Sequence, residues 1–220
     1  MSVMATALKS LIMQRINKAD KGNVWTPTDF VDVGTRDAID KALQRLAIHH
    51  ELRRIGRGLY DRPKINTLTG QLFVPSYQKI IDAIARRDSI RILLDGLTAA
   101  NDLGLTHAVL GKVVVHTDGR LRPIKLGNLT IQFKLTTPGK LYWAGRPAMR
   151  IVQALYWLHD SFAGLSKTEQ KSIQKKLIRI LQDAKQGDVI CKDLKNGLHL
   201  MPIWMQKWIQ ELFKKAIGIS

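Results

Sequence analysis

The chain of 220 residues has one cysteine, Cys191, and no long hydrophobic run. A lone cysteine cannot form an internal disulfide and cannot build a metal site from several thiolates, and such cysteine usage is typical of a reducing compartment. A membrane-spanning helix needs about 20 apolar residues in a row. Lys9, Gln14 and Arg15 interrupt the N-terminal segment, which argues against a secretory signal peptide. We therefore expect a cytoplasmic location and no membrane association.

Patterns that support catalysis are scarce as well. The three glutamates, Glu51, Glu169 and Glu211, lie far apart in the sequence, and no glycine-rich loop ends in Gly-Lys-Ser or Gly-Lys-Thr. No two of the six histidines are four residues apart, the spacing that places two metal ligands on one helix face. We expect no catalytic residue, no bound metal and no cofactor, and hence a protein that is not an enzyme.

Positive charge, in contrast, is abundant. Lysine and arginine total 35 against 18 aspartates and glutamates, for a net charge of +17 and a pI near 10.2. Basic residues outnumber acidic ones by 12 to 7 over residues 1–65, by 12 to 6 over 66–160, and by 11 to 5 over 161–220. Because the excess is spread over sequence that has a hydrophobic pattern, it favours an extended surface for a polyanion over a single basic tail.

The N-terminal 62 residues have the element order of a winged helix-turn-helix. Thr26-Pro27 supplies an N-cap and a first-turn proline, Gly34 ends that short helix, and Thr35 caps the next one. The glycines around Arg57 permit a tight hairpin, the wing. The expected elements are helices over 2–18, 26–31 and 36–49, and strands over 24–25, 52–55 and 58–60.

The remainder predicts a connector over 63–76 and a second domain over 77–220. β-branched residues 112–117 predict a strand, and the alternating segments 123–126 and 129–135 predict a hairpin around Gly127-Asn128. Three helices follow, from about residue 146 to the C-terminus. The predicted fold class is therefore α+β: a winged helix-turn-helix, then a mixed α/β domain with a small sheet and a helical end.

The predicted second helix of the helix-turn-helix and the hairpin carry donors and cations where a DNA groove needs them. Arginine can bind guanine through two hydrogen bonds and glutamine can bind adenine, while lysines meet phosphates. Strand alternation points Arg53 and Arg57 away from the core, toward a groove. Asp37 and Asp40 count against DNA binding, because carboxylates repel phosphates. The alternative interpretation of this helix is a charged face that only contacts solvent. The candidate DNA-binding residues are Thr35, Arg36, Lys41, Gln44, Arg45, Arg53, Arg54 and Arg57.

The last helix has an apolar face and a basic face. Trp204, Trp208 and Leu212 lie on the apolar face, at helical spacing. That face either closes the core of the second domain or docks a protein partner, for which tryptophan is well suited.

Several segments together carry a resemblance to a known family. They are GNVWTPTDFVDVGTRDAIDKALQRLAIHHELRRIGRGLYDRP in the first domain, and AANDLGL, KVVVHTDG, IKLGNLTIQFK and AGRPAMRIVQAL in the second. Over residues 1–160 the chain resembles the AbiEi-like antitoxins of bacterial type IV toxin–antitoxin systems. It departs from them at His50-Glu51, where such sequences commonly have a glycine turn before the wing.

The resemblance implies a transcriptional autorepressor whose first domain binds inverted repeats in its own promoter, often as cooperating copies. It also implies an antitoxin whose second domain counteracts a nucleotidyltransferase-type toxin without a stable complex. Two other hypotheses remain open: an interaction module that docks a partner through its last helix and binds nucleic acid only non-specifically, and an RNA- or nucleotide-modifying enzyme with a basic tethering domain.

Overall fold

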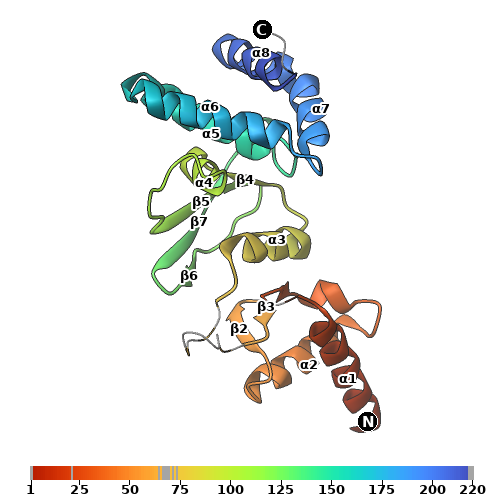
Figure 1. The fold of residues 1–220 in the computed structure, drawn as a ribbon. Helices are drawn as coiled ribbons and strands as arrows, with labels where there is room; N and C mark the ends of the chain where they lie inside the picture. The colour runs from red at the N-terminus through yellow and green to blue at the C-terminus, as the bar shows by residue number, and fades with distance from the viewer. Residues whose placement is uncertain are drawn as a thin grey trace. The chain divides into compact units, whose positions relative to one another are not determined.

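The computed structural model describes residues 2–20, 22–63, 65, 70, 72 and 74–217. The fold is α+β, as the sequence predicts, with α-helices α1 to α8, one three-stranded sheet and one four-stranded sheet in the described part of the chain (Figure 1). Two compact units form, Met1–Ile90 and Arg91–Ser220. Across the described ranges, no helix combines the length and the apolar character that crossing a bilayer requires.

The first unit contains the elements predicted for residues 1–62, in the predicted order, and also α3, which the sequence assigns to the second domain. The elements are α1 (Ser2–Lys18), β1 (Val24–Trp25), the 3-10 helix η1 (Pro27–Phe30), α2 (Arg36–Ile48), β2 (Arg53–Gly56), β3 (Leu59–Asp61) and α3 (Tyr77–Asp88). The three strands form an antiparallel sheet in the order β1-β3-β2. The short second helix is 3-10 rather than α-helical. Thr26 caps its N-terminus and forms a capping box with Asp29.

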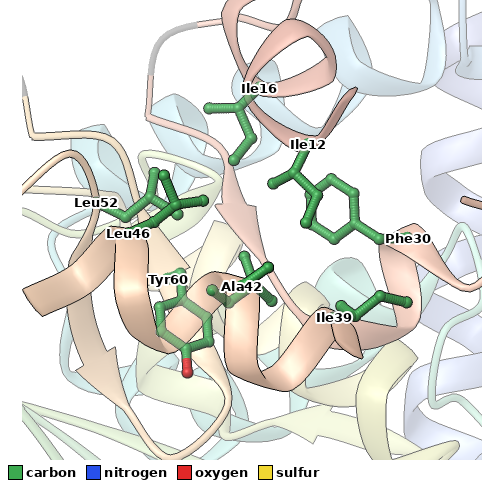
Figure 2. Packing of buried hydrophobic residues seen from close by; sticks show 9 residues of the cluster. Ile12, Ile16, Phe30, Ile39, Ala42, Leu46, Leu52 and Tyr60 are labelled. Atoms are coloured by element: carbon green, nitrogen blue, oxygen red, sulfur yellow. The ribbon is translucent and has the colours of Figure 1, made fainter. Parts of the chain in front are cut away.

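One hydrophobic cluster holds α1, η1, α2 and the sheet together (Figure 2). Side chains that recur every three or four residues on α2 meet the inner face of α1, as amphipathic helices require. Fully burying one such aliphatic side chain contributes about 1.5–3 kcal/mol. The cluster contains Ile12, Ile16, Phe30, Ile39, Ala42, Leu43, Leu46, Leu52 and Tyr60.

Helix α2 ends in a Schellman motif that does without glycine. His50 adopts the left-handed conformation with φ of 58°. The amide of Glu51 donates to the carbonyl of Leu46 at 3.0 Å, and the amide of His50 donates to that of Ala47 at 3.2 Å. The histidine therefore makes the turn where the resembling sequences have glycine, and β2 begins directly after it.

Helix α3 packs on the first unit, so the division of the chain differs from the expected one. Arg86 donates to the carboxylate of Asp29 at 3.2 Å and to the carbonyl of Val24 at 3.3 Å. Arg87 donates to the carbonyl of Arg57 in the hairpin. These charged contacts bind α3 to β1 and the hairpin, and they move the boundary from the predicted connector 63–76 to Ile90.

The second unit begins with a sheet in the order β4-β5-β7-β6. Its central strands β5 and β7 run parallel, and the outer strands pair antiparallel with them. The predicted hairpin is confirmed, because Leu126 pairs with Leu129 around Gly127, whose φ of 58° suits a glycine. The strands are β4 (Ile92–Leu94), β5 (Lys112–Thr117), β6 (Ile124–Leu126) and β7 (Leu129–Leu135).

Four α-helices, not three, follow the sheet (Figure 1). The prediction missed α7, whose bounding glycines resemble a linker in sequence. In the structure Gly197 lets the ring of Trp143 approach, since a Cβ there would lie 2.3 Å from that ring. The helices of this unit are α4 (Gly96–Asp102), before β5, and α5 (Met149–Ser161), α6 (Lys167–Leu181), α7 (Gly187–Gly197) and α8 (Ile203–Ile217) after the sheet.

A glycine at position 50 should stabilise the first unit. The left-handed conformation costs a residue with a Cβ about 1–2 kcal/mol, and glycine avoids most of that cost. We expect His50→Gly to raise the free energy of unfolding by about 0.5–1 kcal/mol, measured by chemical denaturation. His49→Gly is the matched control: His49 has φ of −83°, and glycine there should be neutral or destabilising. Equal effects of the two changes would contradict the assigned role of His50.

Candidate nucleic-acid interface

The outward side of α2 is polar because its inward side is fully used by the core. Ile39, Leu43 and Leu46 have no exposed surface, and an α-helix turns 100° per residue, so the residues between them point to solvent. We call the exposed polar set the α2 face; the helix also exposes one large apolar residue at its C-terminal end, Ile48. The α2 face comprises Arg36, Asp37, Lys41, Gln44 and Arg45.

Thr35 fixes the start of this helix. Its hydroxyl oxygen accepts a hydrogen bond from the amide of Ala38 at 3.4 Å, with extended backbone angles at the cap. The first turn of α2 lies at the positive end of the helix dipole, where an anion is favoured. Thr35 therefore serves the helix itself.

Two cations of the α2 face are paired with carboxylates one turn away. The Nε of Arg36 lies 3.0 Å from Asp40, and the Nζ of Lys41 lies 2.7 Å from Asp37. Both partners of the second pair are more than half exposed, at 64% and 79%. Exposed pairs of this spacing contribute about 0.3–0.5 kcal/mol each. The two aspartates thus hold their partners weakly. Each aspartate is also partly neutralised by its own cation, so the repulsion between these carboxylates and DNA phosphates is reduced.

Gln44 and Arg45 have no carboxylate partner among the described residues. Both are exposed, and neither side chain makes a hydrogen bond or an ion pair with any described residue. Arg45 lies one turn after Lys41 on the same face. The side chain of Arg57, in the hairpin, is likewise exposed and has no partner in the described ranges. These three side chains are available to a ligand without breaking any bond.

Arg53 is the correction to the predicted set. It does not point away from the fold: its Nε and Nη2 donate to the two carboxylate oxygens of Asp61, at 2.9 Å and 2.5 Å, across the paired strands β2 and β3. The side chain of Asp61 is only 2% exposed. The hydrogen bonds to Asp61 raise the pKa of Arg53 above its usual value. Arg53 therefore neutralises a buried carboxylate, and its side chain lies against the fold rather than pointing away from it.

Arg54, rather than Arg53, is the residue of β2 whose side chain points away from the core. It is exposed, and its Nε donates only a long hydrogen bond, 3.3 Å, to the carbonyl of Gly56. A register shift between Arg54 and Gly56 interrupts the β2–β3 ladder, so simple alternation fails in this strand. The hairpin thus presents Arg54 and Arg57 to solvent.

Sequence reasoning also missed the cations that assemble the unit. The two terminal nitrogens of Arg15 on α1 donate to both carboxylate oxygens of Asp32, at 2.8 Å and 2.5 Å. This hydrogen bonding lowers the pKa of Asp32. The Arg15 guanidinium also lies 5.6 Å from the ring centre of Phe30. No periodic pattern announces such a contact, because the two residues come from different elements.

Of the three residues predicted for partner docking, Leu212 is buried, and the two tryptophans are half-buried against rings of their own unit. Leu212 is 3% exposed. Trp204 lies 4.0 Å, centre to centre, from the ring of His159, and Trp208 lies 4.9 Å from that of Phe162. The apolar face of α8 is therefore covered in part by its own unit, through the ring contacts of the two tryptophans.

A cleft of about 500 Å³ opens within the second unit. His116, Lys140, Tyr142 and Tyr156 are among its walls, and the described residues that line it include no carboxylate. Burial lowers the pKa of His116, and Lys134 lowers it further. Within the described ranges, no group of three His, Cys, Asp or Glu side chains converges as a metal site would require.

Comparison with known proteins gives one match. Residues 11–189 match DUF6088, a family of unknown function. No curated protein sequence matches the chain. The matched region covers all of η1, α2 and the hairpin, and it extends into α7.

The pair of Arg53 and Asp61 should be structural. Removing one partner of a buried pair leaves the other unpaired in the interior, which costs about 3 kcal/mol, the lower end of the usual range, because Arg53 is 30% exposed. We expect Arg53→Met to lower the free energy of unfolding by that amount in a denaturant titration. Arg54→Met, on the same strand but exposed, should change it by less than about 0.5 kcal/mol. Equal unfolding midpoints for the two variants would refute the assignment.

Proposed function

We propose that this chain, which belongs to the DUF6088 family of unknown function, is a sequence-specific duplex DNA-binding protein whose first unit is a winged helix-turn-helix. The observation that carries the proposal is the α2 face: an exposed row of donors and cations, followed at once by a hairpin with two exposed arginines. In this arrangement α2 enters the major groove and the hairpin follows the backbone or the minor groove.

The energies of the α2 pairs favour the proposal. A bidentate arginine–guanine contact discriminates against a wrong base by about 1–3 kcal/mol, several times the contribution of an exposed pair one helical turn apart. Arg36 and Lys41 can therefore exchange Asp40 and Asp37 for DNA.

Each exposed residue has a distinct role in this proposal. Arg36, near the N-terminus of α2, contacts a base edge, and Gln44 is the second candidate for a base contact, to adenine. Lys41, Arg45, Arg54 and Arg57 neutralise phosphates. Thr35 directs the N-terminal amides of α2 toward a phosphate. Arg53 is not included, because Asp61 occupies it.

The biological setting that we propose rests on the resemblance to AbiEi-like antitoxins. In this setting the chain is a cytoplasmic autorepressor that binds inverted repeats in its own promoter, with cooperating copies, and an antitoxin that counteracts a nucleotidyltransferase-type toxin without a stable complex. Repression of a reporter behind the chain's own upstream region, together with rescue of growth when a neighbouring toxin gene is expressed, tests these two parts separately.

The alternative, docking of a partner through α8, is supported less well. Docking needs an apolar face that is free, and Trp204, Trp208 and Leu212 are in contact with, or buried by, their own unit. The side chains of Gln44 and Arg45 on the α2 face, in contrast, make no hydrogen bond or ion pair with any described residue.

The role of Arg36 predicts a loss of specificity. We expect Arg36→Ala to weaken binding to the chain's own promoter duplex by about 1–3 kcal/mol and to relax the preference at one base position. Fluorescence anisotropy with a set of duplexes that differ at single positions measures both effects. If Arg36→Ala binds every duplex as the unchanged protein does, α2 is not the recognition helix.

Lys41 predicts a different pattern. Lys41→Ala should weaken binding to promoter and scrambled duplexes by the same factor, and it should reduce the salt slope of binding by about 1, as the loss of one phosphate contact does. Lys18→Ala is the matched control, since it removes an exposed lysine at the end of α1. A loss confined to the promoter duplex would instead assign Lys41 to a base.

A further inference from the structure

Helix α6 of the second unit carries a row of unpaired cations. Four of its exposed residues are basic and recur at every fourth position. None of the four forms an ion pair with any residue that the structure describes. We call them the α6 row: Lys167, Lys171, Lys175 and Arg179.

The spacing of the α6 row is regular. Each step of four residues advances about 6 Å along the axis and about 40° around it, so the row extends for about 18 Å and winds about 120° around the helix. A duplex carries a phosphate every 3.4 Å of rise on each strand, which is about five phosphates over the same length. The row therefore matches a line of phosphates in both length and sign.

The single acidic residue of α6 lies outside this row. Glu169 points to another side of the helix, where its carboxylate accepts from the amide and the hydroxyl of Ser166, at 2.9 Å and 2.7 Å. These hydrogen bonds lower the pKa of Glu169. Its charge is thus engaged in the capping box, and like charges one turn apart in the row repel each other without compensation. A bound polyanion would relieve that repulsion.

The same helix gives a reason to prefer phosphates over a bilayer. Helices that lie on membranes expose an apolar face beside their cations. Ile173, Leu177 and Leu181 of α6 are buried in the unit, and Ile178 and Ile180 are half-buried, so none of its apolar residues is exposed. Near the cations, the exposed residues of α6 include the small hydroxyl residues Thr168 and Ser172. Hydroxyls and lysines are suited to phosphate oxygens and carry no base specificity.

We propose that the α6 row is a second, sequence-independent DNA-binding surface that contacts the phosphate backbone of duplex DNA. This inference rests on the proposed function, because it takes the polyanion to be the DNA that the first unit reads. It assigns the positive charge of residues 161–220 a role that the α2 face does not supply.

The salt dependence of binding tests the α6 row in the full-length chain. Lys171→Gln with Lys175→Gln removes two contacts, so the slope of log K against log salt for a scrambled duplex should become shallower by about 1.8. Between about 50 and 200 mM salt, the unchanged protein should then lose about 12-fold more affinity than this double variant. Lys185→Gln with Lys192→Gln is the control: it removes the same charge from exposed lysines outside α6 and should leave the slope unchanged.

Two outcomes overturn the inference. In the first, the α6 double variant retains the original slope. In the second, the control variant changes the slope as much as the α6 variant does, which would indicate net charge rather than contact. Loss of binding to phosphatidylserine vesicles, with an unchanged slope on DNA, would also overturn it and assign the row to a membrane.

The proposed function fails independently of this inference. If Arg36→Ala and Lys41→Ala weaken DNA binding while the α6 double variant does not, the α2 face stands and the α6 row is refuted. If only the α6 double variant changes binding, the α6 row stands and α2 is not the recognition helix. If the unchanged protein binds no duplex at low salt, both proposals are wrong.

Discussion

Among the residues of the first unit that the structure describes, Asp61 carries the one buried charge, which must be neutralised internally. Its side chain is 2% exposed, and an ion of that kind in the interior is tolerable only with a hydrogen-bonded partner. Arg53, directly opposite on β2, is that partner. The pair joins the strands of the hairpin beside Leu52 and Tyr60 of the core, so the shape of the hairpin, and with it the direction of Arg54 and Arg57, depends on this contact.

The same principle separates the cations of the chain into three groups. Those held by buried or half-buried carboxylates assemble the fold: Arg53 with Asp61, Arg146 with Asp193 and Arg150 with Asp102. Those held by exposed carboxylates, such as Arg36 and Lys41, can be released to a stronger ligand. Those without a described partner, such as Arg45 and the α6 row, are open to an anion already. With 35 bases and 18 acids, many cations must fall in the last group.

Many local features could be predicted from the sequence because local forces decide them. The amphipathic pattern of 36–49 located α2, the threonine cap located its start, and Gly127-Asn128 located the β6–β7 hairpin. The helix α7 could not be located in this way: its glycines resemble a linker, and only the approach of Trp143 to Gly197 explains one of them. The end of α2 also escaped the pattern, because a histidine occupies the left-handed position that glycine usually takes.

By itself, the sequence determined which residues are apolar, where helices and turns begin, and that positive charge is spread along the chain. These properties depend on residues within a few positions of each other or on composition alone. Only the tertiary structure decided which cations remain exposed, because an ion pair joins residues that are distant in sequence, as Arg15 and Asp32 are. It also decided that Trp204 and Trp208 lie against α5 and its C-terminal turn, since burial depends on which surfaces meet when the helices pack.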